Sequence, residues 1–177
     1  MTEKIIIAGS GGQGIMLLGK VLAESAMEEG KFVTWLPAYG AEVRGGTAHC
    51  MVVISDDEIG SPYIDRADTL IIMNKPSLNR FSPRLNKGGI MIVNSSLADP
   101  KESSLNIKKY PFTDMAIKLG NIKVANMIAL GFYLNNRKTV KVKSVLKVME
   151  KMATEGREDL IKINQEALDA GVKLKDG

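Results

Sequence analysis

The chain has one cysteine and one histidine among its 177 residues, Cys50 and His49. A single cysteine excludes an internal disulfide bond, a structural zinc site and an iron–sulfur cluster held by this chain alone. A free thiol is typical of a reducing compartment, and the first residues lack the pattern of a signal peptide. We therefore expect a cytoplasmic protein without a metal ion of its own.

Other signatures are missing as well. The longest apolar stretches, such as residues 127–134, are too short to cross a bilayer. The sequence has no Gly-x-x-x-x-Gly-Lys-Ser/Thr pattern, no nucleophile elbow and no Gly-Asp-Gly motif of the kind that binds thiamine diphosphate. The net charge of +4 is mild, and the late lysines alternate with apolar residues as on a solvated helix face. We therefore expect no nucleic-acid or membrane partner.

The sequence does contain a regular alternation of strand-like and helix-like segments. Apolar, β-branched runs predict strands at 4–9, 32–36, 49–55, 69–73, 89–94 and 106–110, with a short antiparallel strand at 59–62. Helical spacing predicts helices at 14–29, 76–85, 115–119, 124–134, 142–152 and 157–170, with Thr113 and Asp114 as the N-cap region of the third. This order predicts one α/β domain over residues 1–177, a Rossmann-like three-layer fold with a mainly parallel sheet and a helical C-terminal third.

A glycine run, Gly9-Ser10-Gly11-Gly12-Gln13-Gly14, joins the first strand to the first helix. It matches the dinucleotide fingerprint, but NAD binding also needs an acidic residue at the end of the second strand, and that strand ends in Thr34-Trp35-Leu36-Pro37. Two interpretations stay open: a turn that allows close packing, or an anion site of backbone N–H groups. The amide of Gln13 can donate and accept, which suits a ligand or a partner subunit.

A second glycine-rich loop, Tyr39–Thr47, follows the second strand and is expected at the same edge of the sheet. Arg44, Gly45 and Gly46 could offer a guanidinium and N–H groups to a phosphate or carboxylate. Glu42 could pair with Arg44 or reach across an interface, and the alternative is an ordinary surface loop held by that ion pair.

His49 and Cys50 are neighbours on a strand and must point to opposite faces, which excludes a nucleophile–base pair. We expect Cys50 in the core and His49 as a hydrogen-bonded residue at an edge or interface.

Several segments, in this order and at this spacing, together resemble the gamma subunit of 2-oxoacid:ferredoxin oxidoreductases. The segments are 9–14, 33–35, 39–47, 59–62 and 123–131. The loop at 39–47 is most similar to the 2-oxoglutarate branch, and pyruvate, branched-chain and indolepyruvate relatives share much of the pattern. The fold is then expected to resemble domain III of pyruvate:ferredoxin oxidoreductase.

The resemblance implies oxidative decarboxylation of a 2-oxoacid to an acyl-CoA, with electrons passed to ferredoxin. In that family alpha and beta subunits hold thiamine diphosphate and Mg²⁺, and beta or a delta subunit carries the iron–sulfur clusters. This chain would then be an accessory subunit with no catalytic residue, inactive alone, whose partners are the alpha, beta and possibly delta subunits. The isolated chain could instead form a homo-oligomer.

The resemblance also assigns roles to the two glycine-rich loops. They form a candidate edge for CoA or a partner subunit, comprising Gly11, Gly12, Gln13, Gly14, Arg44, Gly45 and Gly46, with Trp35, Tyr39 and Glu42 as interface residues. The alternatives are a stand-alone nucleotide-binding oxidoreductase and a non-enzymatic module that binds an anion.

Overall fold

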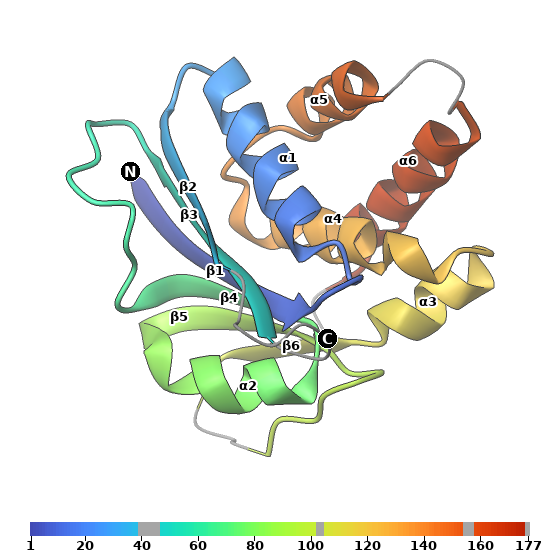
Figure 1. The fold of residues 1–177 in the computed structure, drawn as a ribbon, viewed down its shortest axis with the longest axis horizontal. Coiled ribbons are helices and arrows are strands. Elements are labelled where there is room, and N and C mark those ends of the chain that lie inside the picture. Colours follow the sequence, from blue (N-terminus) through green and yellow to red (C-terminus); the bar gives the residue numbers. More distant parts are fainter. Residues whose placement is uncertain (39–46, 102–104, 154–157, 176–177) are drawn as a thin grey trace.

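One sheet with the strand order β2–β3–β1–β4–β5–β6 forms the middle of the molecule (Figure 1). The computed structural model describes residues 1–38, 47–101, 105–153 and 158–175. The strands are β1 (Thr2–Ser10), β2 (Phe32–Ala38), β3 (Thr47–Ser55), β4 (Ala67–Ile72), β5 (Leu85–Asn94) and β6 (Ile107–Tyr110). The helices are α1 (Ile15–Glu28), α2 (Lys75–Phe81), α3 (Phe112–Lys118), α4 (Ala125–Arg137), α5 (Val142–Met152) and α6 (Glu158–Val172), with short 3-10 turns at Ser82–Arg84 and Ile122–Val124.

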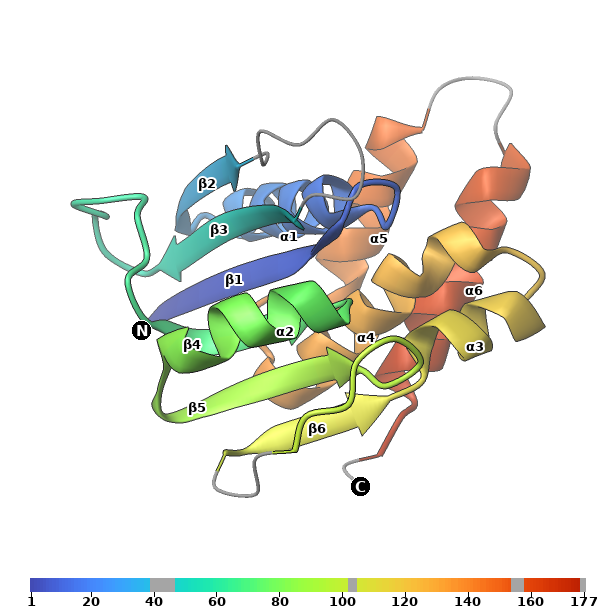
Figure 2. The same ribbon diagram turned by 60° about the horizontal axis from the view of Figure 1, so that its bottom comes forward.

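The sheet is mainly parallel, as the alternation of segments predicts. β1, β4, β5 and β6 pair in parallel, and only β3 runs against its two neighbours, β1 and β2. β2 therefore points the same way as β1. The carboxyl ends of these five strands meet at one edge of the sheet, which is where open α/β folds place their sites (Figure 2).

Helices cover both faces of the sheet and make the three layers. Alternate residues of β1 divide between two cores, because successive strand side chains point to opposite faces. Ile5 and Ile7 belong to the core that α1, α4 and α5 share, whereas Ile6 and Ala8 belong to the core beneath α2. Figure 1 shows α1, α4 and α5 on one side of the sheet and α2 on the other. α6 packs on α4 rather than on the sheet: a Cβ at Gly131 would overlap with the carbonyl of Leu168. None of the described helices combines the length and hydropathy needed to cross a bilayer.

Two local predictions are wrong. Residues 59–62 form no strand, since Gly60 weakens extended pairing and Pro62 has no N–H to give to a ladder. The third helix begins at Phe112, after Pro111, so Thr113 lies inside it. The Thr113 hydroxyl is instead hydrogen-bonded to the buried Asn94 amide at 2.8 Å, a long-range partner that the local sequence pattern did not indicate.

A buried ion pair joins the start of β1 to the end of α4. Glu3 is 3% exposed and accepts hydrogen bonds from the hydroxyl of Thr69 at 2.6 Å and from Nε of Arg137 at 2.9 Å. The second guanidinium arm of Arg137 binds the other carboxylate oxygen. Such a fork-to-fork pair satisfies a carboxylate that the strand has taken out of water.

Replacing Arg137 should therefore destabilise the fold. We expect Arg137→Met to lower the free energy of unfolding by about 3 kcal/mol, because it leaves the Glu3 carboxylate buried and uncompensated. Chemical denaturation measures this. The double variant Glu3→Met/Arg137→Met should lose less than the single one. Lys20→Ala, which breaks an exposed pair with Glu24, is the control and should cost about 0.5 kcal/mol or less. If Arg137→Met lost as little free energy of unfolding as Lys20→Ala does, the role of the ion pair between Glu3 and Arg137 would be contradicted.

Candidate functional site

The glycine turn lies at the carboxyl edge of the sheet, between β1 and α1. Ser10, the last residue of β1, pairs with Thr47, the first residue of β3, and Ala38 at the end of β2 pairs with His49 on the same strand. The predicted arginine loop, residues 39–46, lies outside the described residues. Ala38 and Thr47, which flank it, are at the same edge as the turn.

The run contains two kinds of glycine. A Cβ at Gly9 would lie 2.6 Å from Oε1 of Gln13, and one at Gly14 would overlap with the side chain of Asn126. These two glycines permit close packing. A Cβ at Gly11 or Gly12 would meet nothing within 4 Å, and both residues are exposed. The packing interpretation is therefore supported for Gly9 and Gly14, whereas an anion site at Gly11 and Gly12 stays a prediction.

The open pair leads directly into the N-terminus of α1. Gly12 and Gly14 have φ angles of 87° and 69°, in the left-handed region that glycine adopts readily. Gly14 is the N-cap, no side chain caps the helix, and its first turn carries no acidic residue. The first N–H groups of a helix lack partners within it and carry partial positive charge. This arrangement can bind an anion.

Gln13 is engaged within the chain. Its Oε1 accepts the Ser10 N–H at 2.8 Å, and its Nε2 donates to the carbonyl of Met73 at 3.1 Å. Both functions of the amide thus hold the turn against β1 and the end of β4. A direct role of Gln13 toward a ligand or partner stays a prediction.

Asn126 holds the turn from the other side. It is buried near the start of α4, and its Nδ2 donates to the carbonyl of Gly14 at 3.1 Å. Sequence reasoning included Asn126 only within the segment 123–131 and gave it no role. The available signal was an amide in an otherwise apolar helix, because a buried amide needs partners.

The network continues to the neighbouring strands through Asn94. Its Nδ2 donates to the Met73 carbonyl at 3.2 Å, the same oxygen that Gln13 binds, and its Oδ1 accepts the Thr113 N–H at 3.2 Å. The glycine turn, β4, β5 and α3 are therefore tied to one another at this edge.

Cys50 and His49 point to opposite faces, as predicted. Cys50 is fully buried against α1, and burial raises the pKa of its thiol to about 12, against a smaller lowering by the Trp35 indole. The thiol is therefore protonated and unsuited to act as a nucleophile. His49 packs on Phe81 with ring centroids 4.9 Å apart.

The expectation that His49 is hydrogen-bonded is wrong for its Nδ1. That atom is buried and has no partner within the described part of the chain. Burial first, and then the charges of Arg80 and Arg84, hold the pKa of the His49 imidazole below its usual value. The imidazole is neutral at physiological pH, which reduces the desolvation cost of its position.

Arg80 brings a positive charge to this edge, and sequence reasoning did not single it out. Its guanidinium donates to the Thr47 hydroxyl at 2.7 Å and lies 5.2 Å from the centroid of the Phe81 ring. The contact joins α2 to β3 across 33 residues of sequence, so no local pattern could indicate it.

Of the predicted interface residues and those of the arginine loop, the structure describes only Trp35. Trp35 is 37% exposed on β2, and a Cβ at Gly19 would lie 3.1 Å from its Nε1, so one edge of the indole faces α1. Tyr39, Glu42, Arg44, Gly45 and Gly46 lie outside the described residues, and their roles stay predictions.

Within the described ranges, no group of three or more His, Cys, Asp or Glu side chains could hold a metal ion.

The model of the pyruvate ferredoxin/flavodoxin oxidoreductase family matches residues 4–174. The chain belongs to this family. It is 36% identical over 170 residues to the ketoisovalerate oxidoreductase subunit VorA of Methanothermobacter thermautotrophicus. That alignment covers 96% of this chain and 36% of VorA. It is 38% identical over 128 residues to the 2-oxoglutarate synthase subunit KorC of Archaeoglobus fulgidus, covering 72% of this chain and 66% of KorC.

The family's solved structures share the fold. The crystal structure of a keto/oxoacid ferredoxin oxidoreductase gamma subunit from Geobacter sulfurreducens PCA superposes with a TM-score of 0.82 at 26% identity, covering 96% of this chain and 95% of that one. The resemblance and the three-layer fold drawn from the sequence are thereby confirmed. The chain spans only about a third of the length of the VorA relatives that it matches.

Removing the Gln13 amide should loosen the turn of this family member. We expect Gln13→Ala to lower the free energy of unfolding by about 1–2 kcal/mol, because two hydrogen bonds are lost. The amide hydrogen of Ser10 should exchange faster with solvent, which NMR hydrogen exchange measures. Gln165→Ala, which removes an amide that makes one long hydrogen bond to Glu150 at 3.4 Å, is the control. Unchanged exchange at Ser10 would contradict the role of Gln13 as the support of the turn.

Proposed function

We propose that this chain is the accessory, gamma-type subunit of a multisubunit 2-oxoacid:ferredoxin oxidoreductase. The complex would oxidatively decarboxylate a 2-oxoacid to an acyl-CoA and reduce ferredoxin. The observation that carries the proposal is the open Gly11–Gly12 pair at the uncapped N-terminus of α1, in a domain that belongs to this family.

The first candidate for the oxoacid is 2-oxoglutarate. The KorC relative, which is named for 2-oxoglutarate, is 38% identical to this chain over 128 residues, and the loop at 39–47 resembles the 2-oxoglutarate branch. The 36% identity to VorA, which is named for ketoisovalerate, makes 2-oxoisovalerate the second candidate.

CoA is the ligand that the glycine turn would take. CoA supplies the thiol that accepts the acyl group, and its phosphates are anions of the kind that a helix N-terminus binds. The exposed backbone of Gly11 and Gly12 has room for a phosphate, and the absence of an acidic residue from the first turn of α1 avoids repulsion. Arg44, Gly45 and Gly46 would complete the site from the neighbouring loop.

The remaining cofactors would belong to partner chains. The one cysteine, Cys50, is fully buried and its thiol is protonated, so it is unsuited to ligate an iron–sulfur cluster. We propose that alpha and beta subunits bind thiamine diphosphate and Mg²⁺, and that beta or delta subunits carry the clusters. This chain's role would be to position CoA at the entrance of the shared active site.

Co-expression with candidate alpha and beta subunits tests the assembly. The purified complex should reduce a viologen dye only when CoA and a 2-oxoacid are both present, with 2-oxoglutarate compared against pyruvate and 2-oxoisovalerate. The isolated chain should show no activity. Dehydrogenase activity of the isolated chain with NAD(P), or failure to co-purify with any candidate subunit, would overturn the proposal.

A carboxylate placed in the open turn should impair CoA use by that complex. We expect Gly11→Asp to raise the KM for CoA about tenfold or more, because the new charge occupies the anion position at the helix N-terminus, and to leave the KM for the oxoacid unchanged. Steady-state kinetics of the complex measure both constants. Gly60→Asp adds the same charge at an open position away from the turn and should change neither. An unaltered KM for CoA in Gly11→Asp would refute the CoA assignment.

A further inference from the structure

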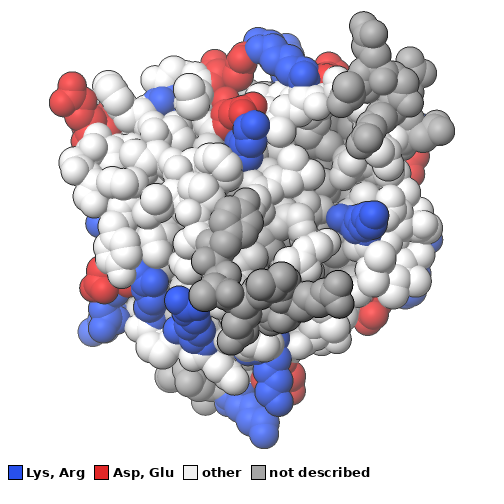
Figure 3. All heavy atoms as spheres, in the orientation of Figure 1, with Lys and Arg blue, Asp and Glu red and all other residues white. Residues whose placement is uncertain are grey.

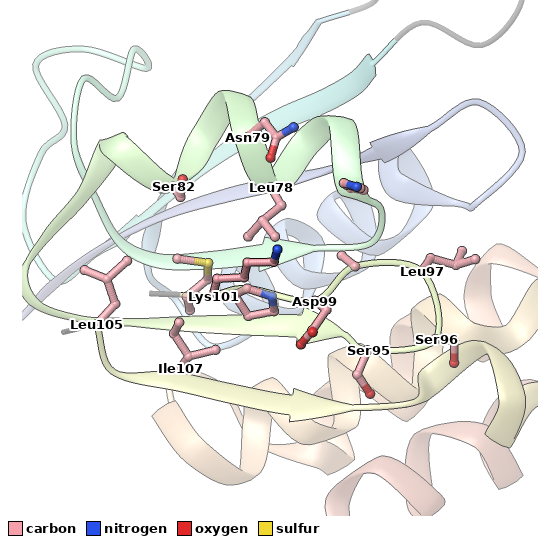
Figure 4. A pocket seen from close by; sticks show the side chains of 14 residues that line it. Leu78, Asn79, Ser82, Ser95, Ser96, Leu97, Asp99, Lys101, Leu105 and Ile107 are labelled. Carbon is pink, nitrogen blue, oxygen red and sulfur yellow. The ribbon is translucent and has the colours of Figure 1, made fainter. Parts of the chain in front are cut away.

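The connection from β5 to β6 contains no helix in its described part, residues 95–101 and 105–106. Parallel strands are usually joined by a crossover helix that covers the sheet. Here the α2 side of β6 is left partly uncovered: Ile107 is half-buried, whereas Met91, its partner in register on β5, is fully buried. The result is a cavity of about 720 Å³ beneath α2 (Figure 4). This volume lies within the range of small-molecule sites.

The cavity has an apolar floor and an apolar roof. Ile107 lies on the strand side, and Leu78 projects from α2 toward it, while Leu105 lies toward one end (Figure 4). Apolar side chains on two opposite sides suit a flat group with apolar faces, such as a heterocyclic base.

Polar side chains line the rest of the wall. Asn79 and Ser82 come from the α2 side, and Ser95 and Ser96 come from the turn after β5. The Ser96 hydroxyl accepts the N–H of Asp114 at 3.1 Å and can still donate. A long hydrocarbon chain would leave these hydroxyl and amide groups unpaired, which costs free energy, so the wall favours a ligand with hydroxyls and ring nitrogens.

Two lysines give the cavity a positive charge. Lys75 and Lys101 both line it, and the amino group of Lys101 extends beneath Leu78 (Figure 4). Neither lysine forms an ion pair with another described residue, whereas Asp99, the acidic residue of the lining, is paired with Lys109 at 3.2 Å. Basic side chains are also prominent over the lower part of the molecular surface, where α2 lies (Figure 3). The cavity therefore favours an anion.

We propose that this cavity binds a nucleotide, with the base between Leu78 and Ile107 and the phosphates at Lys75 and Lys101. Ser95 and Ser96 are placed to bind the ribose hydroxyls. The inference goes beyond the proposed function, since the cavity lies on the α2 side of the sheet and the glycine turn leads to the α1 side. The ligand is either a free nucleotide or the adenosine diphosphate portion of a larger molecule.

Calorimetric titration of the full chain with ADP tests the proposal. We expect saturable binding at one site. Lys75→Gln and Lys101→Gln should each weaken it about tenfold, because each removes a charge-assisted contact with phosphate. Lys87→Gln alters an exposed lysine that does not line the cavity and should change nothing. Circular dichroism establishes that each variant is folded. ADP affinity insensitive to both cavity variants would overturn the proposal.

Titrations with pyrophosphate and with CoA extend the test. Pyrophosphate should bind more weakly than ADP, and equal affinity would overturn the nucleotide assignment, since the base would then contribute nothing. Lack of competition by CoA identifies a free nucleotide and supports the site. Competition by CoA would also support the site, as one for the ADP portion of CoA, but it would overturn the assignment of the CoA phosphates to the glycine turn. Gly11→Asp should leave ADP binding unchanged, whatever its effect on the KM for CoA. Loss of ADP binding in that variant would place the nucleotide at the glycine turn and overturn the proposal.

Discussion

Helix α1 lies closer to the sheet than ordinary side chains allow, and the arrangement of the domain depends on this approach. A Cβ at Gly19 would overlap with Sγ of Cys50, and one at Gly14 would overlap with the amide of Asn126. Glycine removes the atoms that would hold the helix away, in an interior where even one methyl group matters. Because α4 and α5 pack on α1 in turn, the helical layer on this face lies where these glycines place it.

The same packing prepares the turn for a ligand. Gln13 fixes the turn to the ends of β1 and β4, and Asn126 fixes the carbonyl of Gly14. The backbone of Gly11 and Gly12 is therefore supported from both sides while its outer surface stays open. A site that is ordered before binding loses less conformational entropy when the ligand arrives. A glycine run that first suggests a dinucleotide fingerprint thus combines packing with a proposed anion site.

The sequence predicted the layers well because the strands are continuous apolar runs and the helices have clear amphipathic spacing. It failed where a distant partner decides the local structure: the third helix begins at Phe112, and Thr113 hydrogen-bonds with Asn94 rather than capping that helix. The glycine turn was predicted from its residues alone. Its supports were not, because Asn126 is 112 residues from Gly14 in sequence and only the fold brings them together.

Helix α2 contacts both candidate sites. Ser77 donates to the carbonyl of Gly9 at 3.4 Å, and the next residue, Leu78, faces the cavity over β5 and β6. A hydrogen bond of that length is weak, so a shift of α2 that accommodates a ligand would cost little at the turn. The turn itself is held by Gln13 and Asn126, neither of which belongs to α2. The geometry therefore favours two sites that bind independently on opposite faces of one sheet.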